Sequence, residues 1–363
     1  FLFGGRTNIL GQMLFDERPK EKREELYNRE KELEEIRRNL HRPLILVTGI
    51  RRIGKTSVLK VALNSSGIPF IILDCRKLKQ NYSKADLYRI FSEALSSKLD
   101  FLKEIVSRIR GISILGNYVE IKWKGEGSIS IADIFDKLNE KRLIIAIDEA
   151  QRLRGPLSTD IKNAIAYSYD YNKNLTFILT GSEVGLLYDF LGKEDPDSPL
   201  FGRYYQEIKL ERFDEGHSKD FLRKGFSELG IEVAEDKIDS IVNFFDGIPG
   251  WLTFAGNLIA SGKDIETLKE SAISLALEEL NNLLELKSQF SIISARRYKI
   301  ALKCISEGRN SWSELLRCIE DHEGKTISSS VFFNLLKNLE ELNIIKEYKF
   351  LDPIYREASK RLH

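Results

Sequence analysis

The stretch that decides the fold is Leu44-Ile-Leu-Val-Thr-Gly49-Ile-Arg-Arg-Ile-Gly54-Lys55-Thr56. Its apolar first part is typical of a short strand buried on both faces, and the residues after Thr56 predict a helix. Gly49 and Gly54 let the backbone turn tightly, so that its N–H groups and the helix N-terminus can surround phosphate oxygens. The spacing G-x-x-x-x-G-K-T between a strand and a helix therefore predicts a P-loop.

Two side chains of this loop have specific expected roles. We expect Lys55 to bridge the β- and γ-phosphates of a nucleotide and Thr56 to place its hydroxyl on Mg²⁺. The residues predicted to contact the nucleotide here are Gly49, Arg51, Arg52, Ile53, Gly54, Lys55, Thr56 and Ser57.

A second apolar strand, Leu143-Ile-Ile-Ala-Ile, ends in two adjacent acids, Asp148 and Glu149. The carboxyl end of such a strand is where open α/β sheets bind ligands. We expect Asp148 to hold the hydration shell of Mg²⁺ and Glu149 to orient and polarise the attacking water. The alternative, acids that complement the dipole of a following helix, accounts poorly for their occurrence together with a P-loop.

Polar residues also follow a third predicted strand, which begins at Leu175. Thr180 or Ser182 could reach the γ-phosphate, although Ser182 could instead cap the next helix. Further along, Arg203 precedes a short strand. It is a candidate arginine finger or, alternatively, the partner of a structural ion pair with the acidic segment 211–285.

Other periodic segments complete the predicted αβ framework. Residues 17–40 predict one amphipathic helix, residues 69–74 a strand and residues 83–110 a long helix. Residues 112–123 alternate around Gly116-Asn117, as in a β-hairpin. That hairpin could cover a sheet edge, or Trp123 and its neighbouring lysines could act as a nucleic-acid wedge.

Charge is balanced over the 363 residues but unevenly distributed, with 56 basic and 55 acidic side chains in all. Up to position 210 the chain has 35 basic and 29 acidic residues, residues 211–285 have 7 and 16, and the remainder has 14 and 10. The overall balance argues against a strongly basic nucleic-acid coat protein. No apolar run approaches the length of a membrane span, so we expect no membrane partner.

Three cysteines and four histidines offer little sign of a metal site. The cysteines are Cys75, Cys304 and Cys318. An odd count without a C-x-x-C pair predicts neither a disulfide framework nor a zinc site. A reducing cytoplasm is then the expected location, and the histidines are interpreted as structural or surface residues. Met13 is the only methionine, which leaves open whether residues 1–12 are native.

Several of these segments together resemble the archaeal P-loop ATPase family, which belongs to the AAA+ and STAND assemblage of ASCE-type ATPases. The segments are NREKEL (28–33), GIRRIGKTS (49–57), IIAIDEAQ (144–151), LTGSEVGLL (179–187), SPLFGR (198–203) and DGIPGWL (246–252). The acidic strand looks like a Walker B motif. The resemblance implies ATP or ADP with Mg²⁺ as cofactors.

The same resemblance implies further contacts with the nucleotide. Asn28, Arg29 and Glu30 would lie near the adenine and ribose, and Ile248 with Pro249 would pack a lid helix against the base. Other AAA+ proteins have a helix with a γ-phosphate-sensing arginine at this place, but residues 249–261 contain no basic residue. Arg203 is then the better candidate, and hydrolysis is expected to be slow or dependent on a partner.

The C-terminal segment resembles a winged helix, with three short helices followed by an apparent hairpin over IIKEYKFLDPIYR. Val331, Phe332, Leu335, Leu336, Leu339 and Leu342 are expected to form the core face of the third helix. Its other face carries one cation, Lys337, and one anion, Glu341, a weak surface for a major-groove reader. DNA and a protein surface both remain as partners.

These observations predict an α/β parallel-sheet P-loop fold with a helical lid and a winged helix. The expected domains are an arm or leader over 1–24, an ATPase core over 25–210, a lid over 211–285 and a winged helix over 286–363. The expected function is a switch driven by ATP binding and Mg²⁺-dependent hydrolysis. The alternative is a DNA-binding regulator, resembling an initiator, in which nucleotide only stabilises the fold.

Overall fold

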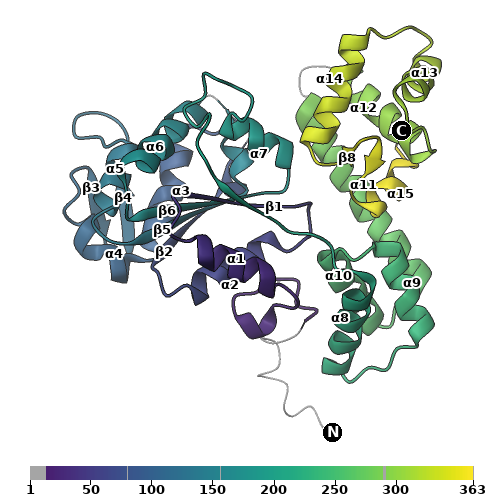
Figure 1. The fold of residues 1–363 in the computed structure, drawn as a ribbon, viewed down its shortest axis with the longest axis horizontal. Helices are drawn as coiled ribbons and strands as arrows, with labels where there is room; N and C mark the ends of the chain where they lie inside the picture. Colours follow the sequence, from purple (N-terminus) through teal and green to yellow (C-terminus); the bar gives the residue numbers. More distant parts are fainter. Residues whose placement is uncertain (1–13, 80, 156, 289–291, 363) are drawn as a thin grey trace. The chain divides into compact units, whose positions relative to one another are not determined.

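The computed structural model describes residues 14–362 except 80, 156 and 289–291 (Figure 1). The predictions for Met13 and for residues 1–12 lie outside this range. The chain forms two compact units. The sheet unit comprises Pro19–Gly49 and Gly54–Leu210, and the helical unit comprises the described residues up to Arg18, the loop Ile50–Ile53 and the chain from Glu211 onward.

The sheet unit is built on five parallel strands in the order β2-β5-β6-β1-β7. The strands are β1 (Leu44–Thr48), β2 (Phe70–Asp74), β5 (Leu143–Asp148), β6 (Leu175–Gly181) and β7 (Gln206–Lys209). Every residue of β1, β5 and β6 is buried, as the continuous apolar runs predict. The α/β parallel-sheet class is therefore confirmed.

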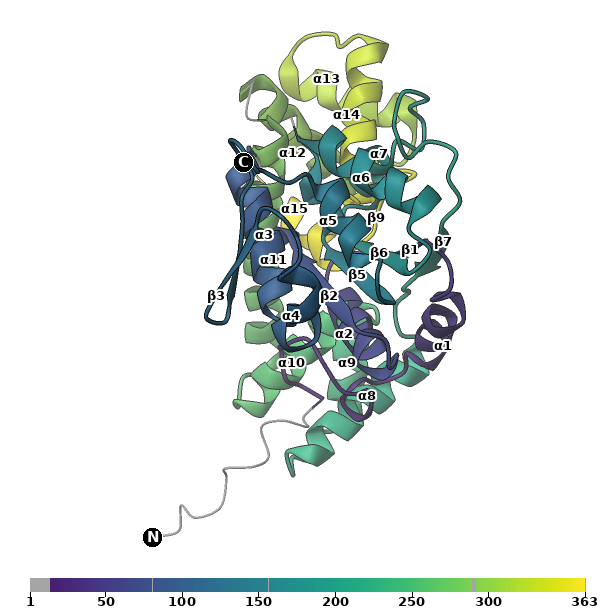
Figure 2. The same ribbon diagram turned by 90° about the vertical axis from the view of Figure 1, so that its left-hand side faces the viewer.

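Helices cover both faces of this sheet (Figures 1 and 2). The helices of the unit are η1 (Arg23–Glu25), α1 (Glu30–Asn39), α2 (Lys55–Ser65), η2 (Cys75–Lys77), α3 (Lys84–Ser96), α4 (Leu99–Val106), α5 (Ile131–Leu138), η3 (Ala150–Leu153), α6 (Ser158–Tyr171) and α7 (Val184–Leu191). Leu44 and Leu46 join the large core beneath α3, α5 and α6. Since alternate strand residues point to opposite faces, the equally buried Ile45 and Val47 face α2.

Two helix predictions for this unit were too long. The helix expected over 17–40 begins only at Glu30, because Asn28 has a left-handed backbone with φ 48°. The helix expected over 83–110 is divided at Ser97 and Lys98 into α3 and α4. The Ser83 side chain accepts a hydrogen bond from the N–H of Asp86 and fixes the start of α3.

The hairpin forms as expected from β3 (Ile112–Leu115) and β4 (Tyr118–Ile121), paired antiparallel. Val119 and Ile121 are buried in the main core, and Trp123 packs against it. These contacts favour the half-buried packing role of the hairpin over the nucleic-acid wedge. The strands form a separate two-stranded sheet and pack on α3, so they extend no edge of the main sheet.

The helical unit contains α8 (Glu215–Glu228), α9 (Glu235–Phe245), α10 (Pro249–Ala260), α11 (Ile265–Ser288), α12 (Ile292–Ser306), α13 (Trp312–Glu323), α14 (Ser329–Glu341) and α15 (Pro353–Ser359), with the short pair β8 (Ile345–Lys346) and β9 (Lys349–Phe350). The predicted winged helix is confirmed in α12 to α14 and the β8–β9 pair. Within the unit, α15 packs on both α9 and α11. No helix among the described residues is long and apolar enough to cross a membrane.

Three predictions for the C-terminal segment were wrong. Residues from Pro353 onward continue as α15 rather than as a hairpin, because Asp352 caps the helix and Pro353 occupies its first turn. Val331 is 40% exposed and does not join the core face of α14. Cys304 and Cys318 form a disulfide between α12 and α13, although their number and spacing predicted none.

Phe15 packs against α8 and α10 of the helical unit. Its ring meets Phe221 and Phe226 edge-on at centroid distances of 5.7 and 5.1 Å. A Cβ at Gly225 or Gly256 would lie within 2.5 Å of that ring. The two glycines therefore make the space that Phe15 fills.

We expect Phe15→Ala to lower the free energy of unfolding of the helical unit by about 3–5 kcal/mol, the usual cost of removing a buried ring. Chemical denaturation followed by circular dichroism measures the change. Phe333→Ala is the matched control, because Phe333 is 56% exposed. Equal stability losses in the two variants would contradict this packing role.

Candidate functional site

The glycines of the P-loop adopt the conformations that the motif requires. Gly49 has φ 149° and Gly54 has φ 96°, both values that residues with a side chain rarely adopt. Gly54 is the residue before α2, so the first N–H groups of that helix face the loop. Lys55 is 5% exposed, and its Nζ donates to the carbonyl oxygen of Gly49 at 3.0 Å. That contact holds the ammonium group inside the loop.

Asp148 stands at the end of β5 and accepts hydrogen bonds from two threonines. Thr180 Oγ1 lies 2.5 Å from Asp148 Oδ1, and Thr56 Oγ1 lies 3.1 Å from Asp148 Oδ2. Burial raises the pKa of Asp148 above its usual value, against the lowering effect of these hydrogen bonds. The carboxylate and the Thr56 hydroxyl thus form one oxygen cluster.

Glu149 follows directly but has a different environment. Its backbone is left-handed, with φ 56°, and its Oε2 accepts from Ser182 Oγ at 2.7 Å and Gln151 Nε2 at 2.5 Å. Burial alone would raise the pKa of Glu149, but the charge of Lys55 and these hydrogen bonds outweigh it and hold the pKa below its usual value. Glu149 is therefore an ionised carboxylate at neutral pH.

Strand order explains why these side chains meet. β6 lies between β1 and β5, so Thr180 stands between the P-loop strand and the acidic strand. Its hydroxyl also accepts from the N–H of Glu149 at 3.0 Å. Ser182 bonds to Glu149, and the residue before α7 is Glu183. The capping alternative for Ser182 is therefore wrong.

The middle of the P-loop belongs to the helical unit. Arg51 Nε and Arg52 Nη1 lie 2.9 and 2.5 Å from the carboxylate of Glu279 on α11. The Arg52 guanidinium also lies 4.0 Å from the ring centroid of Trp251. Burial acts to raise the pKa of Glu279, but the two arginines hold it below its usual value. Both arginine side chains, predicted to contact nucleotide, are thus engaged by Glu279.

Ile248 and Pro249 lie beside the same loop. Ile248 is the residue before α10, Pro249 is in its first turn, and the N–H of Gly250 donates to the carbonyl oxygen of Arg52 at 2.9 Å. Ile53 is buried, and Ser57 Oγ accepts from the N–H of Lys20 at 3.1 Å. The contact of Ile248 and Pro249 with a base stays a prediction.

The three residues expected near adenine lie at the start of α1. Arg29 is buried and pairs with Glu32 at 3.0 Å, and Glu30 pairs with Arg23. Asn28 has the left-handed backbone that separates α1 from the preceding turn. Their contact with a nucleotide also stays a prediction.

Arg203 is held by contacts within the sheet unit. Its Nη2 lies 2.6 Å from Asp170 on α6, and its Nη1 donates to the carbonyl oxygen of Pro199. The ion pair expected as the alternative to a finger is present, but its partner is Asp170 and not the segment 211–285. A role as an arginine finger would require Arg203 to leave this pair.

Sequence reasoning missed two residues of the site. Arg76, just after β2, lies 3.7 Å from Asp148 and makes a closer pair with Asp74. Gln151 holds Glu149 as described above. Both could have been found from their positions in the sequence. Arg76 follows β2 and Gln151 follows β5, and the carboxyl ends of parallel strands meet at one edge of the sheet.

The comparison with known families agrees with this geometry. Residues 26–254 match the profile of the ATPase domain found predominantly in Archaea. The chain belongs to this archaeal ATPase family. Residues 293–357 of this family member match the C-terminal winged helix-turn-helix domain of MCM proteins.

The Walker-type ATPase PABY2304 of Pyrococcus abyssi is a similar solved structure of high coverage. Its sequence is 33% identical, the match covers 96% of this chain and 100% of that one, and the TM-score is 0.80. The Aeropyrum pernix ORC1 protein in complex with DNA is 15% identical, with 88% and 85% of the chains covered and a TM-score of 0.42. A likeness at this TM-score supports no functional conclusion for the present chain. The search of curated proteins found no match to this chain.

Proposed function

We propose that this ATPase-family chain binds ATP, hydrolyses it with Mg²⁺, and uses its nucleotide state to set the position of the lid and winged helix. The observation that carries the proposal is the meeting of Lys55, Thr56, Asp148 and Glu149 at one edge of the sheet. A buried cation, two left-handed glycines and a helix N-terminus suit phosphate. The adjacent acids suit the metal and water of phosphoryl transfer.

The donor set also fits Mg²⁺. The Thr56 hydroxyl and the Asp148 carboxylate supply oxygen ligands 3.1 Å apart, and Mg²⁺ in proteins binds few protein oxygens alongside phosphate and water. When bound, the ion would neutralise charge on the phosphates. Thr180 donates to Asp148 and so orients the carboxylate toward Thr56.

Glu149 would act on the attacking water. Its charge is secured by Lys55, and Ser182 and Gln151 fix its Oε2. An ionised, oriented carboxylate can accept a hydrogen bond from water and draw its proton as the oxygen attacks phosphorus. With Arg203 engaged by Asp170, we expect basal hydrolysis to be slow.

The switch part of the proposal rests on the helical unit. This unit contains Ile50–Ile53 together with the lid and winged-helix helices. The ring of Trp251 stacks with the Arg52 guanidinium, and its Nε1 donates to the buried Asp352 at 2.8 Å. Asp352 is the residue just before α15. Arg361, a basic residue near the C-terminus, pairs at 2.7 Å with Glu270 in the acidic segment 211–285. A ligand that moves the loop would act directly on these contacts.

We expect Glu279→Gln to leave ATP affinity within about threefold of wild type but to remove most of the nucleotide-dependent change in distance between spin labels at Lys137 and Ser330. The reason is that Glu279 joins both loop arginines to α11, whereas it is not predicted to touch phosphate. A ligand shifts a conformational equilibrium only through different affinities for the two states. Pulsed electron paramagnetic resonance measures this distance in three conditions: with ADP, with a non-hydrolysable ATP analogue and without nucleotide.

Glu278→Gln is the matched control, because Glu278 is the exposed neighbour on the same helix. We expect that variant to respond to nucleotide as the wild type does. A label distance indifferent to nucleotide in the wild type would refute the switch. An unchanged response in Glu279→Gln would remove Glu279 from it.

The second candidate function, a DNA-binding regulator, has one observation in its favour, the winged helix itself. The exposed residues of α14 are Ser329, Ser330, Val331, Phe333, Asn334, Lys337 and Glu340. This face offers little charge for phosphate neutralisation. Tight duplex binding that weakens by about 10³-fold or more between low and moderate salt, without nucleotide turnover, would favour the regulator.

A further inference from the structure

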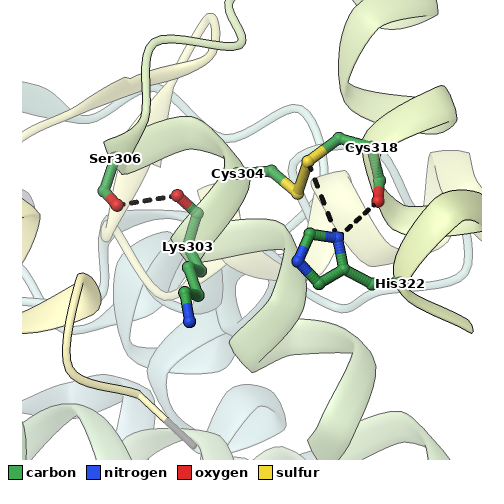
Figure 3. Close-up of a disulfide and its surroundings, with 5 residues drawn as sticks. All are labelled: Lys303, Cys304, Ser306, Cys318 and His322. Carbon is green, nitrogen blue, oxygen red and sulfur yellow. Dashed lines mark hydrogen bonds between the residues drawn. A yellow bond between two sulfur atoms is a disulfide. The ribbon is translucent and has the colours of Figure 1, made fainter.

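A second cluster of reactive side chains lies within the winged helix, apart from the P-loop and its acids. Cys304 on α12 and Cys318 and His322 on α13 bring their ligand atoms within 4.8 Å of one another (Figure 3). Cys304 is buried, Cys318 is half-buried and His322 is exposed. Among the described residues, no other three His, Cys, Asp or Glu side chains group in this way.

The orientation of His322 suits a metal ligand. Its Nδ1 lies 2.8 Å from the carbonyl oxygen of Cys318 and 4.0 Å from the Cys318 sulfur (Figure 3). A ring N–H donated to a backbone carbonyl fixes the tautomer and leaves Nε2 with a lone pair, as is usual for metal-binding histidines. Positions 318 and 322 are four apart on one helix, so both side chains share a face.

We propose that, once the disulfide is reduced, Cys304, Cys318 and His322 form a binding site for a zinc-class divalent cation, and that the metal and the disulfide exclude each other. Reduction requires a dithiol. One thiolate of the dithiol attacks one sulfur of the disulfide, which forms a mixed disulfide and releases the other cysteine as a thiolate. The second thiolate of the dithiol then breaks the mixed disulfide, so the reductant leaves as a cyclic disulfide and the protein gains two thiols once both cysteine thiolates take up protons from water. Metal binding displaces the protons of both thiols.

The backbone separation is compatible with both states. The Cα atoms of Cys304 and Cys318 are 6.2 Å apart. With Zn–S bonds of about 2.3 Å in a tetrahedral site, the two sulfurs would lie roughly 3.8 Å apart, a separation that side-chain rotation can provide. Two sulfurs and one imidazole favour zinc over Mg²⁺ or Ca²⁺, which prefer oxygen. A fourth position stays open for water or another ligand.

The two states have a common structural effect. Either the disulfide or the metal joins α12 to α13, whereas the reduced, metal-free protein loses this link. We therefore expect Zn²⁺ to raise the unfolding temperature of the reduced chain and to leave that of the oxidised chain unchanged, by the linkage between binding and folding.

Co²⁺ titration of the full chain tests the site directly, since tetrahedral cobalt bound to thiolates has strong charge-transfer and visible absorption. The chain is reduced with a dithiol, freed of it without air and titrated in the absence of nucleotide. We expect absorption in the reduced chain only, reversed by Zn²⁺. Cys318→Ser should abolish it, and His322→Gln should weaken Co²⁺ affinity by about tenfold or more.

His217→Gln is the matched control, an exposed helical histidine outside the cluster, and should bind Co²⁺ as the wild type does. The third cysteine, Cys75, is fully buried, and burial raises the pKa of its thiol, so it should contribute no signal. Equal absorption in the reduced and oxidised chains, or in Cys318→Ser and the wild type, would overturn the proposal. Undiminished affinity in a folded His322→Gln would overturn the three-ligand site.

Discussion

Glu149→Gln is expected to bind ATP as tightly as the wild type while hydrolysing it about 10²-fold more slowly or worse. The amide keeps the size of the side chain, and its oxygen can still accept from Ser182 and Gln151, which hold Glu149 Oε2. It cannot accept a proton as a carboxylate does. Single-turnover measurement of phosphate release, alongside calorimetric titration with ATP, separates the two effects.

Glu120→Gln provides the control for this variant, because Glu120 is an exposed acid on β4 in the same unit. Its turnover should equal that of the wild type. If Glu149→Gln also hydrolyses at the wild-type rate, Glu149 serves only to hold Ser182 and Gln151, and another group must polarise the water. If it fails to bind ATP, the separation of binding from hydrolysis is lost.

The central strands and their polar ends were predictable from sequence because burial on both faces demands continuous apolar runs. β1, β5 and β6 each consist of such a run, so the polar residues that follow stand at their carboxyl ends. Sequence could not supply the strand order. It is β6 in the middle that lets Thr180 donate to Asp148, a contact between residues far apart in the chain.

Helix boundaries failed where apolar periodicity continued through a break in the backbone. Leu26 and Leu33 share the helical period, but Asn28 between them is left-handed. At the C-terminus the error was avoidable, since Asp352-Pro353 is a recognised start signal for a helix and α15 begins there.

The long-range pairs were beyond the reach of sequence. Arg51 and Arg52 lie in a motif whose neighbours imply phosphate, yet Glu279 binds them from more than 220 positions away. The Cys304–Cys318 pair likewise depends on the crossing of α12 and α13. Only the four-residue spacing of Cys318 and His322 offered a local signal of the cluster.

Lys55→Ala should lower ATP affinity by about 10- to 100-fold, the cost of losing a charge-assisted contact with the phosphates. The wild-type ammonium is buried and held at Gly49, so contacts within the loop fix its position. Isothermal calorimetry with ATP and Mg²⁺ measures the loss. Lys60→Ala is the control on the same helix, since Lys60 is partly exposed and pairs with Glu21.

Truncating a buried lysine can also disturb packing, so Lys55→Met should be measured in parallel. Methionine retains most of the side-chain volume without the charge, and it should lose as much affinity as alanine if the charge is what binds phosphate. Both variants should also raise the pKa of Glu149, because Lys55 is the main group that opposes its burial. The acidic limb of the pH–rate profile of ATP hydrolysis, measured at saturating ATP, should then lie at higher pH in these variants than in the wild type. Undiminished ATP binding in Lys55→Met and Lys55→Ala, each shown to be folded, would contradict the assignment of this loop to the β- and γ-phosphates.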